Sequence, residues 1–189
     1  MKLALAIAAA LVALAAPLSA QAGGATHQTA DVLAWTEATT TLSPPVYGTA
    51  TLMRNDNGIG MTFHTTGLPA GDAVTIWWII IDPSGNVVSA QFAAGHVIGN
   101  DGVGNFAGYL GEGDTSGCFA TWFPCLGLST DPAQGDSRTA NVLLLARVHG
   151  PAEPGRIPTQ IHTSETTDEE VTCSETLCQV QGAFFPAVP

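Results

Sequence analysis

The clearest pattern in the chain is the alternation of apolar and polar residues, which is typical of β-strands with one buried face. Two alternating runs, at residues 47–54 and 59–64, are separated by the sequence Asn-Asp-Asn-Gly. Short segments of Asn and Asp that end in Gly form tight turns between antiparallel strands. The pattern therefore predicts a hairpin. Three of its side chains should face the core: Ile59, Met61 and Phe63.

Two longer apolar runs predict strands in the middle of a sheet. Residues 73–81 are rich in β-branched and aromatic side chains, and the run is too short to cross a membrane. We therefore expect a central strand that is covered on both faces. Residues 141–148 predict a second strong strand.

Weaker patterns predict the other strands, which are 87–98, 103–110, 156–162 and 179–185. Gly95 is a possible bulge in the first of them, and residues 100–102 should form a hairpin turn. Pro158 indicates that its strand lies at an edge, because proline cannot donate a ladder hydrogen bond. Residues 30–41 are compatible with either a strand or a short helix.

Together these segments give about seven to nine short strands and no strong helix pattern. The predicted fold is all-β: an antiparallel β-sandwich with Greek-key-like connections, or a partly closed barrel. We expect residues 47–189 to form this single domain. Residues 23–46 should be an N-terminal extension, of which 23–29 is flexible.

The N-terminus has the features of a secretory signal peptide. Lys2 precedes an apolar run at residues 3–16, and small residues up to Ala22 offer a cleavage site. A transmembrane anchor is the alternative, but the run is shorter than a bilayer requires. The sequence therefore predicts removal of residues 1–22 and a secreted or periplasmic mature protein without a membrane span.

After that cleavage the chain has no lysine, and its four arginines stand against 16 acidic residues, a net charge of −12. Nucleic acids and anionic lipids are bound through Lys and Arg, so neither is an expected partner. The excess of acid favours neutral or cationic partners or divalent cations. Alternatively, it serves only to keep an exported protein dispersed.

The four cysteines, Cys118, Cys125, Cys173 and Cys178, predict two disulfides, because an even number in an exported chain indicates a disulfide framework. Their spacing favours two local loops among the three possible pairings. A four-cysteine zinc site is the alternative, although its usual Cys-x-x-Cys pairs are absent.

The first cysteine pair lies in a long polar segment at residues 111–138. Loops of this length within a compact domain are usually functional or carry structure of their own. Trp122 and Phe123 lie between the two cysteines and are candidate binding residues, because exposed aromatic side chains mark contact surfaces. The alternative is that both rings fold back onto the core.

A second candidate segment begins within the predicted strand at 141–148. From Val142 to Ile161 it reads Val-Leu-Leu-Leu-Ala-Arg-Val-His-Gly-Pro-Ala-Glu-Pro-Gly-Arg-Ile-Pro-Thr-Gln-Ile. This sequence resembles the closing motif of the CHRD (chordin-type) domain, which is an apolar strand ending in Val-His, a turn of Pro and Gly, and then Ile with Gln-Ile or Gln-Leu. Gly-Thr-Ala at 48–50 and Gly-Leu at 67–68 resemble earlier motifs of the family.

The resemblance covers residues 47–161 and implies an extracellular β-sandwich module without established catalytic residues. Where the family often has His-x-His, this chain has Thr-Ile-Trp-Trp at 75–78, so that His149 is the matched histidine. Arg156 stands where an acid is usual, and Pro158 where a Gly is common. The Trp-Trp strand and the His-Gly-Pro turn are also similar to those of a group of bacterial exported proteins.

No motif of a hydrolase nucleophile, a metalloprotease or a phosphate-binding loop is present, so no catalytic residue is predicted. His149 could hold the turn that follows it by bonding a backbone carbonyl, or it could be a metal ligand. Calcium is possible at the Asn/Asp turn 55–57 or at the acidic residues 168–170. Turn chemistry and a solvated loop are the respective alternatives.

These observations favour an exported, non-enzymatic binding or structural module whose partner is an unknown protein or surface component. Its candidate contacts are the loop at 111–138 and the turn at 150–155. The alternative is a metal-binding protein or a metal-dependent enzyme that uses His149 and nearby acidic loops. No cofactor other than a possible calcium ion is expected.

Overall fold

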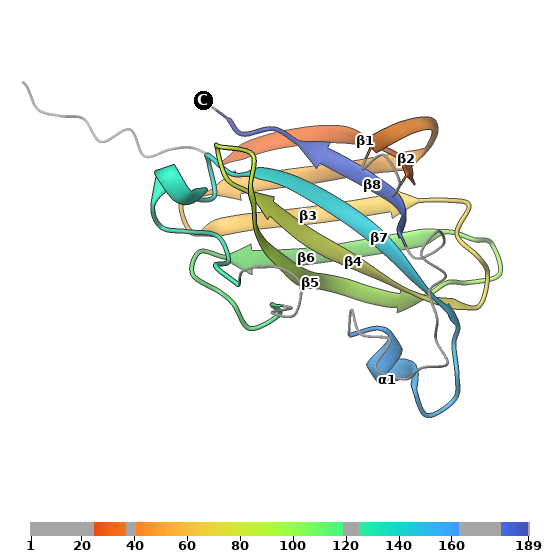
Figure 1. The fold of residues 1–189 in the computed structure, drawn as a ribbon. Coiled ribbons are helices and arrows are strands. Elements are labelled where there is room, and N and C mark those ends of the chain that lie inside the picture. Colours follow the sequence, from red (N-terminus) through yellow and green to blue (C-terminus); the bar gives the residue numbers. More distant parts are fainter. Residues whose placement is uncertain (1–24, 37–40, 119–124, 163–178, 189) are drawn as a thin grey trace, which may run out of the picture.

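The computed structural model describes residues 25–36, 41–118, 125–162 and 179–188. Eight antiparallel strands form one sheet that curls into a nearly closed barrel (Figure 1). The strands are β1 (Thr26–Thr36), β2 (Thr41–Asn55), β3 (Gly58–Thr65), β4 (Asp72–Ile81), β5 (Val87–Val97), β6 (Gly104–Gly111), β7 (Asn141–Pro151) and β8 (Gln179–Phe185). The described residues also form the short helices η2 (Pro132–Gln134) and α1 (Ile157–Gln160).

The strand order is β5-β4-β7-β8-β1-β2-β3-β6, so β5 and β6 are the two end strands of the sheet. Their backbones approach each other closely, because a Cβ at Gly108 of β6 would lie 2.9 Å from the carbonyl oxygen of Ala93 of β5. The all-β prediction is confirmed. Of its two alternatives, the curled single sheet corresponds to the partly closed barrel.

The predicted hairpin is present as β2 and β3, which pair in antiparallel register on both sides of the turn. The three side chains predicted to face the core are buried: Ile59, Met61 and Phe63. The Oδ1 atom of Asn55 accepts a hydrogen bond from the backbone N–H of Asn57 at 2.8 Å. A side chain that bonds the backbone two residues later is the turn chemistry for which Asn is favoured.

β4 is the central strand that the apolar run predicts, since it pairs with β5 on one side and β7 on the other. Alternate side chains of β4 fill the barrel interior: Val74, Ile76, Trp78 and Ile80. Their neighbours on β7, in the same order, are Val148, Ala146, Leu144 and Val142. The strands predicted at 141–148 and 179–185 are confirmed as β7 and β8.

β1 corrects the prediction of an N-terminal extension, because residues 26–36 lie between β2 and β8 in the sheet. Val32 of β1 is fully buried in the core. The polar residues that suggested a flexible segment alternate with inward-facing ones, so they occupy the outer face of a strand. β1 pairs with β2 along its length, whereas the described residues of β1 and β8 pair at two positions, Leu33↔Gly182 and Ala34↔Gln181.

The prediction of a strand at 156–162 is wrong, because residues 157–160 form the helix α1. Pro158 lies in the first turn of this helix, where the missing N–H of proline is not needed. The backbone N–H of Gln160 donates to the carbonyl of Arg156 at 2.9 Å, which closes the helical turn. The signal that was taken for an edge strand is therefore the start of a helix.

Gly95 is not the bulge of β5, since the register against β4 shifts between Phe92 and Ala94. Its role is a close approach, because a Cβ at Gly95 would lie 1.8 Å from the carbonyl oxygen of Ile161. The predicted turn at 100–102 connects β5 with β6. These two strands share no ladder, so the turn bridges the ends of the sheet instead of closing a hydrogen-bonded hairpin.

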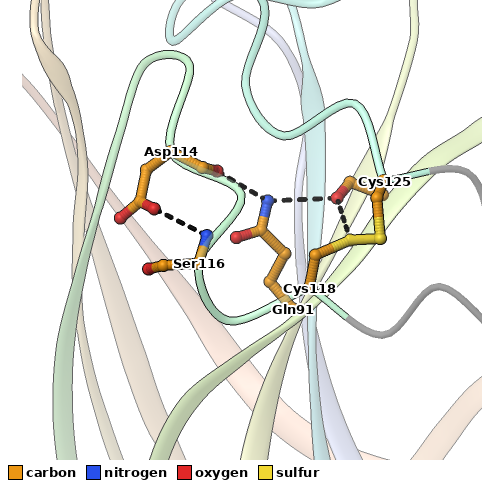
Figure 2. Close-up of a disulfide and its surroundings, with 6 residues drawn as sticks. Gln91, Asp114, Ser116, Cys118 and Cys125 are labelled. Atoms are coloured by element: carbon orange, nitrogen blue, oxygen red, sulfur yellow. Dashed lines mark hydrogen bonds between the residues drawn. A yellow bond between two sulfur atoms is a disulfide. The ribbon is translucent and has the colours of Figure 1, made fainter.

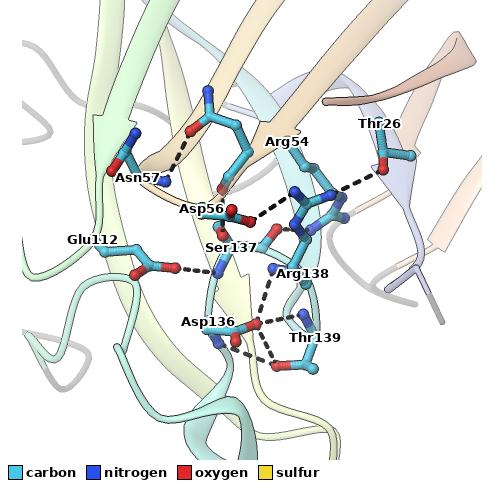
Figure 3. A network of polar contacts seen from close by, with 10 residues as sticks. Thr26, Arg54, Asp56, Asn57, Glu112, Asp136, Ser137, Arg138 and Thr139 are labelled. Atoms are coloured by element: carbon cyan, nitrogen blue, oxygen red, sulfur yellow. Dashed lines mark hydrogen bonds and ion pairs between the residues drawn. The ribbon is translucent and has the colours of Figure 1, made fainter. Parts of the chain in front are cut away.

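The side chain of Arg54, near the end of β2 and thus at one end of the barrel, is 0% exposed. It belongs to a network of polar contacts (Figure 3). Its Nη1 donates hydrogen bonds to the carbonyl oxygens of Ser137 at 3.0 Å and Ala140 at 2.9 Å. Its Nη2 donates to the carbonyl of Pro186 at 3.1 Å, and its Nε donates to Oε1 of Gln28 at 2.6 Å. Arg54 therefore ties β2 to β1, to the loop before β7 and to the segment after β8.

The acceptors of Arg54 named above are neutral oxygens. Burial, together with the charge of Arg138, lowers the pKa of Arg54 to about 10, and Asp136 opposes this effect. The guanidinium thus stays protonated at neutral pH. Its burial is compensated by hydrogen bonds to oriented carbonyl groups, which is the arrangement that a buried charge requires.

Candidate functional site

His149, the candidate histidine, is buried at the end of β7 with 3% of its surface exposed. Its Nε2 lies 2.7 Å from Oγ1 of Thr75 on β4, and the same oxygen accepts a hydrogen bond from Nε1 of Trp77 at 2.8 Å. Burial, together with the nearby charge of Arg147, lowers the pKa of His149 to about 4. The imidazole is therefore neutral at pH 7, and its Nε2 can accept the hydroxyl proton of Thr75.

This geometry gives His149 a structural partner in a neighbouring strand. The partner is the hydroxyl of Thr75, whereas the sequence suggested a backbone carbonyl of the following turn. The Thr75 side chain points to the outer face of the sheet, as does that of Trp77, yet both are buried. The segment after β7 accounts for part of this burial.

Residues 150–162 form a compact unit on the outside of the sheet, which we call the cap. The side chain of Gln160 holds it together, because its Nε2 donates to the carbonyl of Pro151 at 3.0 Å. The Oε1 atom of the same side chain accepts the backbone N–H of Glu153 at 2.9 Å. The turn at 150–155, a candidate contact in the sequence, is thus fixed from inside the cap.

The far end of the cap lies against β5. The carbonyl of Ile161 occupies the space over Gly95, and the ring of His162 stacks on Phe92 with 5.4 Å between the ring centroids. Phe92 in turn contacts Trp77 edge to face at 6.2 Å. The segment that resembles the CHRD closing motif therefore has two parts: its first half is strand β7 of the sheet, and its second half lies in the cap, against the outer face of the sheet at β5.

Substitution of Gly95 by Ala should detach the cap, because the new methyl group would need the position of the Ile161 carbonyl oxygen. We expect trypsin to cleave the Arg156–Ile157 bond of the folded variant at least about tenfold faster than that of the wild type, since local opening controls such cleavage. The absence of lysine after Lys2 keeps the digest simple to follow by mass spectrometry.

The matched control is Gly60→Ala, another strand glycine, where a Cβ would have ordinary contacts of 3.6 Å or more. Its cleavage at Arg156 should equal that of the wild type. If Gly95→Ala is also cleaved at the wild-type rate, the close approach of Ile161 does not hold the cap in place.

Cys118 and Cys125 form the local disulfide that the spacing favours, with their Cα atoms 5.7 Å apart (Figure 2). The backbone before it lies along β5, where the N–H of Phe92 donates to the carbonyl of Gly117 at 2.9 Å. Gln91 is buried beside the disulfide, and its Nε2 donates to the carbonyl of Asp114 at 3.1 Å. The described part of the loop therefore covers part of the free edge of β5, an end strand of the sheet. Covering such an edge prevents it from pairing with another chain.

The loop also contributes to the core, because Leu128 is fully buried. Much of the segment 111–138 is consequently a structural element, and removal of it would also remove core contacts. The candidate residues Trp122 and Phe123 lie outside the described residues. The second cysteine pair, Cys173 and Cys178, lies outside them as well.

The turn considered for calcium is engaged in other contacts. Asp56 forms an ion pair with Arg138 at 2.8 Å (Figure 3), and Asn55 holds the backbone of the turn. Within the described ranges of the chain, no group of three or more His, Cys, Asp or Glu side chains could hold a metal ion. The acidic residues 168–170 fall outside these ranges.

The outward side chains of β1, β2, β3 and β6 form a regular surface, half-buried at its centre and exposed around it, which we call the polar face. The ladders align these side chains in three rows across the four strands. The rows are Asp31-Thr49-His64-Asn105, Thr29-Thr51-Thr62-Ala107 and His27-Met53-Gly60-Tyr109. Because neighbouring strands lie about 4.8 Å apart, side chains within a row can contact each other directly.

Two pairs of side chains on the polar face are joined by hydrogen bonds. The hydroxyl groups of Thr51 and Thr62 lie 2.7 Å apart, and Nδ1 of His64 lies 2.6 Å from Oδ1 of Asn105. Each pair connects neighbouring strands. The side chains are therefore held in one arrangement by the sheet before any partner binds.

Tyr109 is the exposed aromatic residue of the polar face, with 55% of its surface accessible. A Cβ at Gly60 would lie 3.7 Å from Cδ2 of the ring, and one at Gly58 would lie 2.8 Å from its hydroxyl oxygen. The ring thus extends along β3 in the space that these two glycines leave. Aromatic side chains beside cross-strand glycines are a known stabilising pair in sheets.

The opposite side of the barrel differs from the polar face. There most outward positions of β4 and β7 are buried, among them Thr75, Trp77, Leu143, Leu145 and His149. One wall of the barrel is thus covered, while the wall of β1, β2, β3 and β6 presents its side chains to solvent.

Sequence reasoning did not predict the polar face. It assigned residues 27–31 to an extension, and it did not establish which strands are neighbours. The available signal was the recurrence of Thr, His or Asp at every second position of residues 27–31, of Thr at 49 and 51, and of Thr and His at 62 and 64. The sheet order was needed to place these segments side by side.

Comparison of the chain with protein-family models, curated proteins and solved structures finds no match. Among the residues that the structure describes, no helix is long and apolar enough to cross a membrane.

Proposed function

We propose that this protein is an exported, non-enzymatic binding module that holds its partner on the polar face. The observation that carries the proposal is the low charge of this surface. Asp31 is the one residue with a fixed charge among its twelve positions, although the chain has 16 acidic residues. A strand face that serves only solubility normally carries many charged side chains.

The rigidity of the polar face supports the same proposal. Its side chains stand on four paired strands, and two of its pairs are fixed by hydrogen bonds. A surface that is ordered before binding loses little conformational entropy when a partner arrives. Binding sites on strands are also more precisely placed than sites on loops.

Export is supported by the N-terminal sequence pattern and by the disulfide between Cys118 and Cys125. Disulfides persist mainly in oxidising compartments. The resemblance of residues 142–161 to the CHRD motif also favours an extracellular β module. The buried position of His149 supports a role without catalysis, since its Nε2 is engaged by Thr75.

Affinity capture tests the proposal. The full chain is produced in an exporting host, and the purified product is immobilised and exposed to secreted and cell-surface fractions of its source organism. We expect the wild type to retain a component that Thr49→Glu loses, because the new carboxylate adds charge at the centre of a row. The retained component should be released with unchanged mass, as expected for binding without chemical conversion.

The matched control is Thr159→Glu, at another exposed threonine, on α1, and this variant should retain the component. Circular dichroism of both variants should match the wild type. Capture that is identical in Thr49→Glu and the wild type would show that the polar face is not the contact. Failure of the wild type to retain any component would contradict the binding function.

A further inference from the structure

The charge of the polar face limits the chemistry of its partner. The full chain has a net charge of −11, while the face contains one acid, Asp31, and neither Lys nor Arg. An anionic partner would be repelled by the chain and would find no cation on this face. A cationic partner would gain more from the acidic loops than from the polar face. A neutral partner has the best electrostatic match.

The hydrogen-bonding groups of the face indicate a partner that both donates and accepts. The middle row contains three threonine hydroxyls, those of Thr29, Thr51 and Thr62, and each hydroxyl has donor and acceptor capacity. The neighbouring row adds the amide of Asn105 and the imidazole of His64. Sugar hydroxyls also combine both capacities, so that a polyhydroxylated chain could pair with a whole row.

Tyr109 adds an apolar contact at the end of the third row. Its ring extends along β3 and is more than half exposed, which leaves an aromatic surface open to solvent. Aromatic rings have a large apolar area and a polar tip, and they are favoured where a partner has both kinds of surface. The C–H groups on one side of a sugar ring, next to its hydroxyls, have this mixed character.

The rows also have the dimensions of an extended polymer. Each row crosses four strands at a spacing of about 4.8 Å per strand, which is close to the length of one hexose unit. We infer that the polar face binds a neutral polysaccharide, with Tyr109 stacked on one sugar ring and the threonine row bonded to its hydroxyls. This inference rests on the proposed function and specifies its partner.

Native affinity electrophoresis of the exported full chain tests the inference. The gels contain dextran, galactomannan or a mixed-linkage β-glucan, with polygalacturonate as the anionic comparison. We expect at least one neutral polysaccharide to retard the wild type, with no retardation by polygalacturonate. Tyr109→Ala should weaken this binding by about tenfold, the scale of a lost aromatic contact, whereas Tyr109→Phe should retain most of it.

The matched control is Phe184→Ala, which removes another exposed aromatic ring, 43% accessible, from β8 on a different part of the barrel. Its retardation should equal that of the wild type, and thermal melts should show that all variants are folded. The inference is overturned if no neutral polysaccharide retards the wild type, or if the two alanine variants behave alike. Capture of a protein at the polar face in the preceding experiment would also overturn it, while leaving the binding function intact.

Discussion

Replacement of Arg54 by Met should lower the free energy of unfolding by about 3 kcal/mol or more, because each buried acceptor left without a donor costs about 1–3 kcal/mol. The methionine fills part of the volume but leaves the carbonyl groups of Ser137, Ala140 and Pro186 without their buried donor. Typical domains have a total stability of about 5–15 kcal/mol, so the loss would be a large part of the whole. Urea denaturation followed by tryptophan fluorescence measures it.

Arg156→Met is the control for the loss of a positive charge. Arg156 pairs with Glu153 on the surface of the cap, and such exposed pairs contribute less than about 1 kcal/mol. We therefore expect the Arg156 variant to unfold at nearly the wild-type urea concentration. A loss below about 1 kcal/mol for Arg54→Met would mean that its hydrogen bonds do not hold the end of the barrel together.

Acidification from pH 6.5 to about 4 should cost the fold about 3 kcal/mol through His149. Burial, together with Arg147, lowers the pKa of this histidine from 6.5 to about 4. Between these values the unfolded chain takes up a proton that the folded chain does not, so stability falls as the pH falls. The contribution is complete above pH 6.5, and its loss levels off below pH 4.

Urea midpoints measured between pH 7 and pH 4 would show this dependence. His149→Gln removes the titrating group and should flatten the slope in this interval, whereas His162→Gln, at an exposed position, should keep the wild-type slope. Carboxylates titrate in the same range, so the difference between the two variants is the quantity to compare. Equal slopes in both variants would show that His149 does not control the pH dependence.

The success of the sequence predictions depended on whether the local signal and the tertiary structure agree. The β2–β3 hairpin was predictable because the Asn-Gly turn and the alternation of Ile59, Met61 and Phe63 specify the same register. β4 was predictable because residues 73–81 are apolar except for Thr75, so neither side of the strand has a polar surface that could face solvent. In both cases the chain contains the information within a few neighbouring residues.

The failures arose where the decisive contact is distant in sequence. Pro158 is compatible with an edge strand and with the first turn of a helix. In the structure, the helix places Ile161 against Gly95, and the sequence does not reveal this contact. His149 was identified as a residue of interest, but its partner Thr75 lies 74 positions away on β4. The polar face requires the order of four strands, a property of the whole sheet.

The short pairing between β1 and β8 has a mechanical consequence. In the described residues these strands share two paired positions, while β5 and β6 share no ladder. The barrel therefore consists of two four-stranded halves, β5-β4-β7-β8 and β1-β2-β3-β6. Tension applied between residues 26 and 188 would act first on the β1–β8 junction, where Arg54 and Gln28 both bind the carbonyl of Pro186. We expect the barrel to yield by separation of these halves, with the hairpin of β2 and β3 still intact.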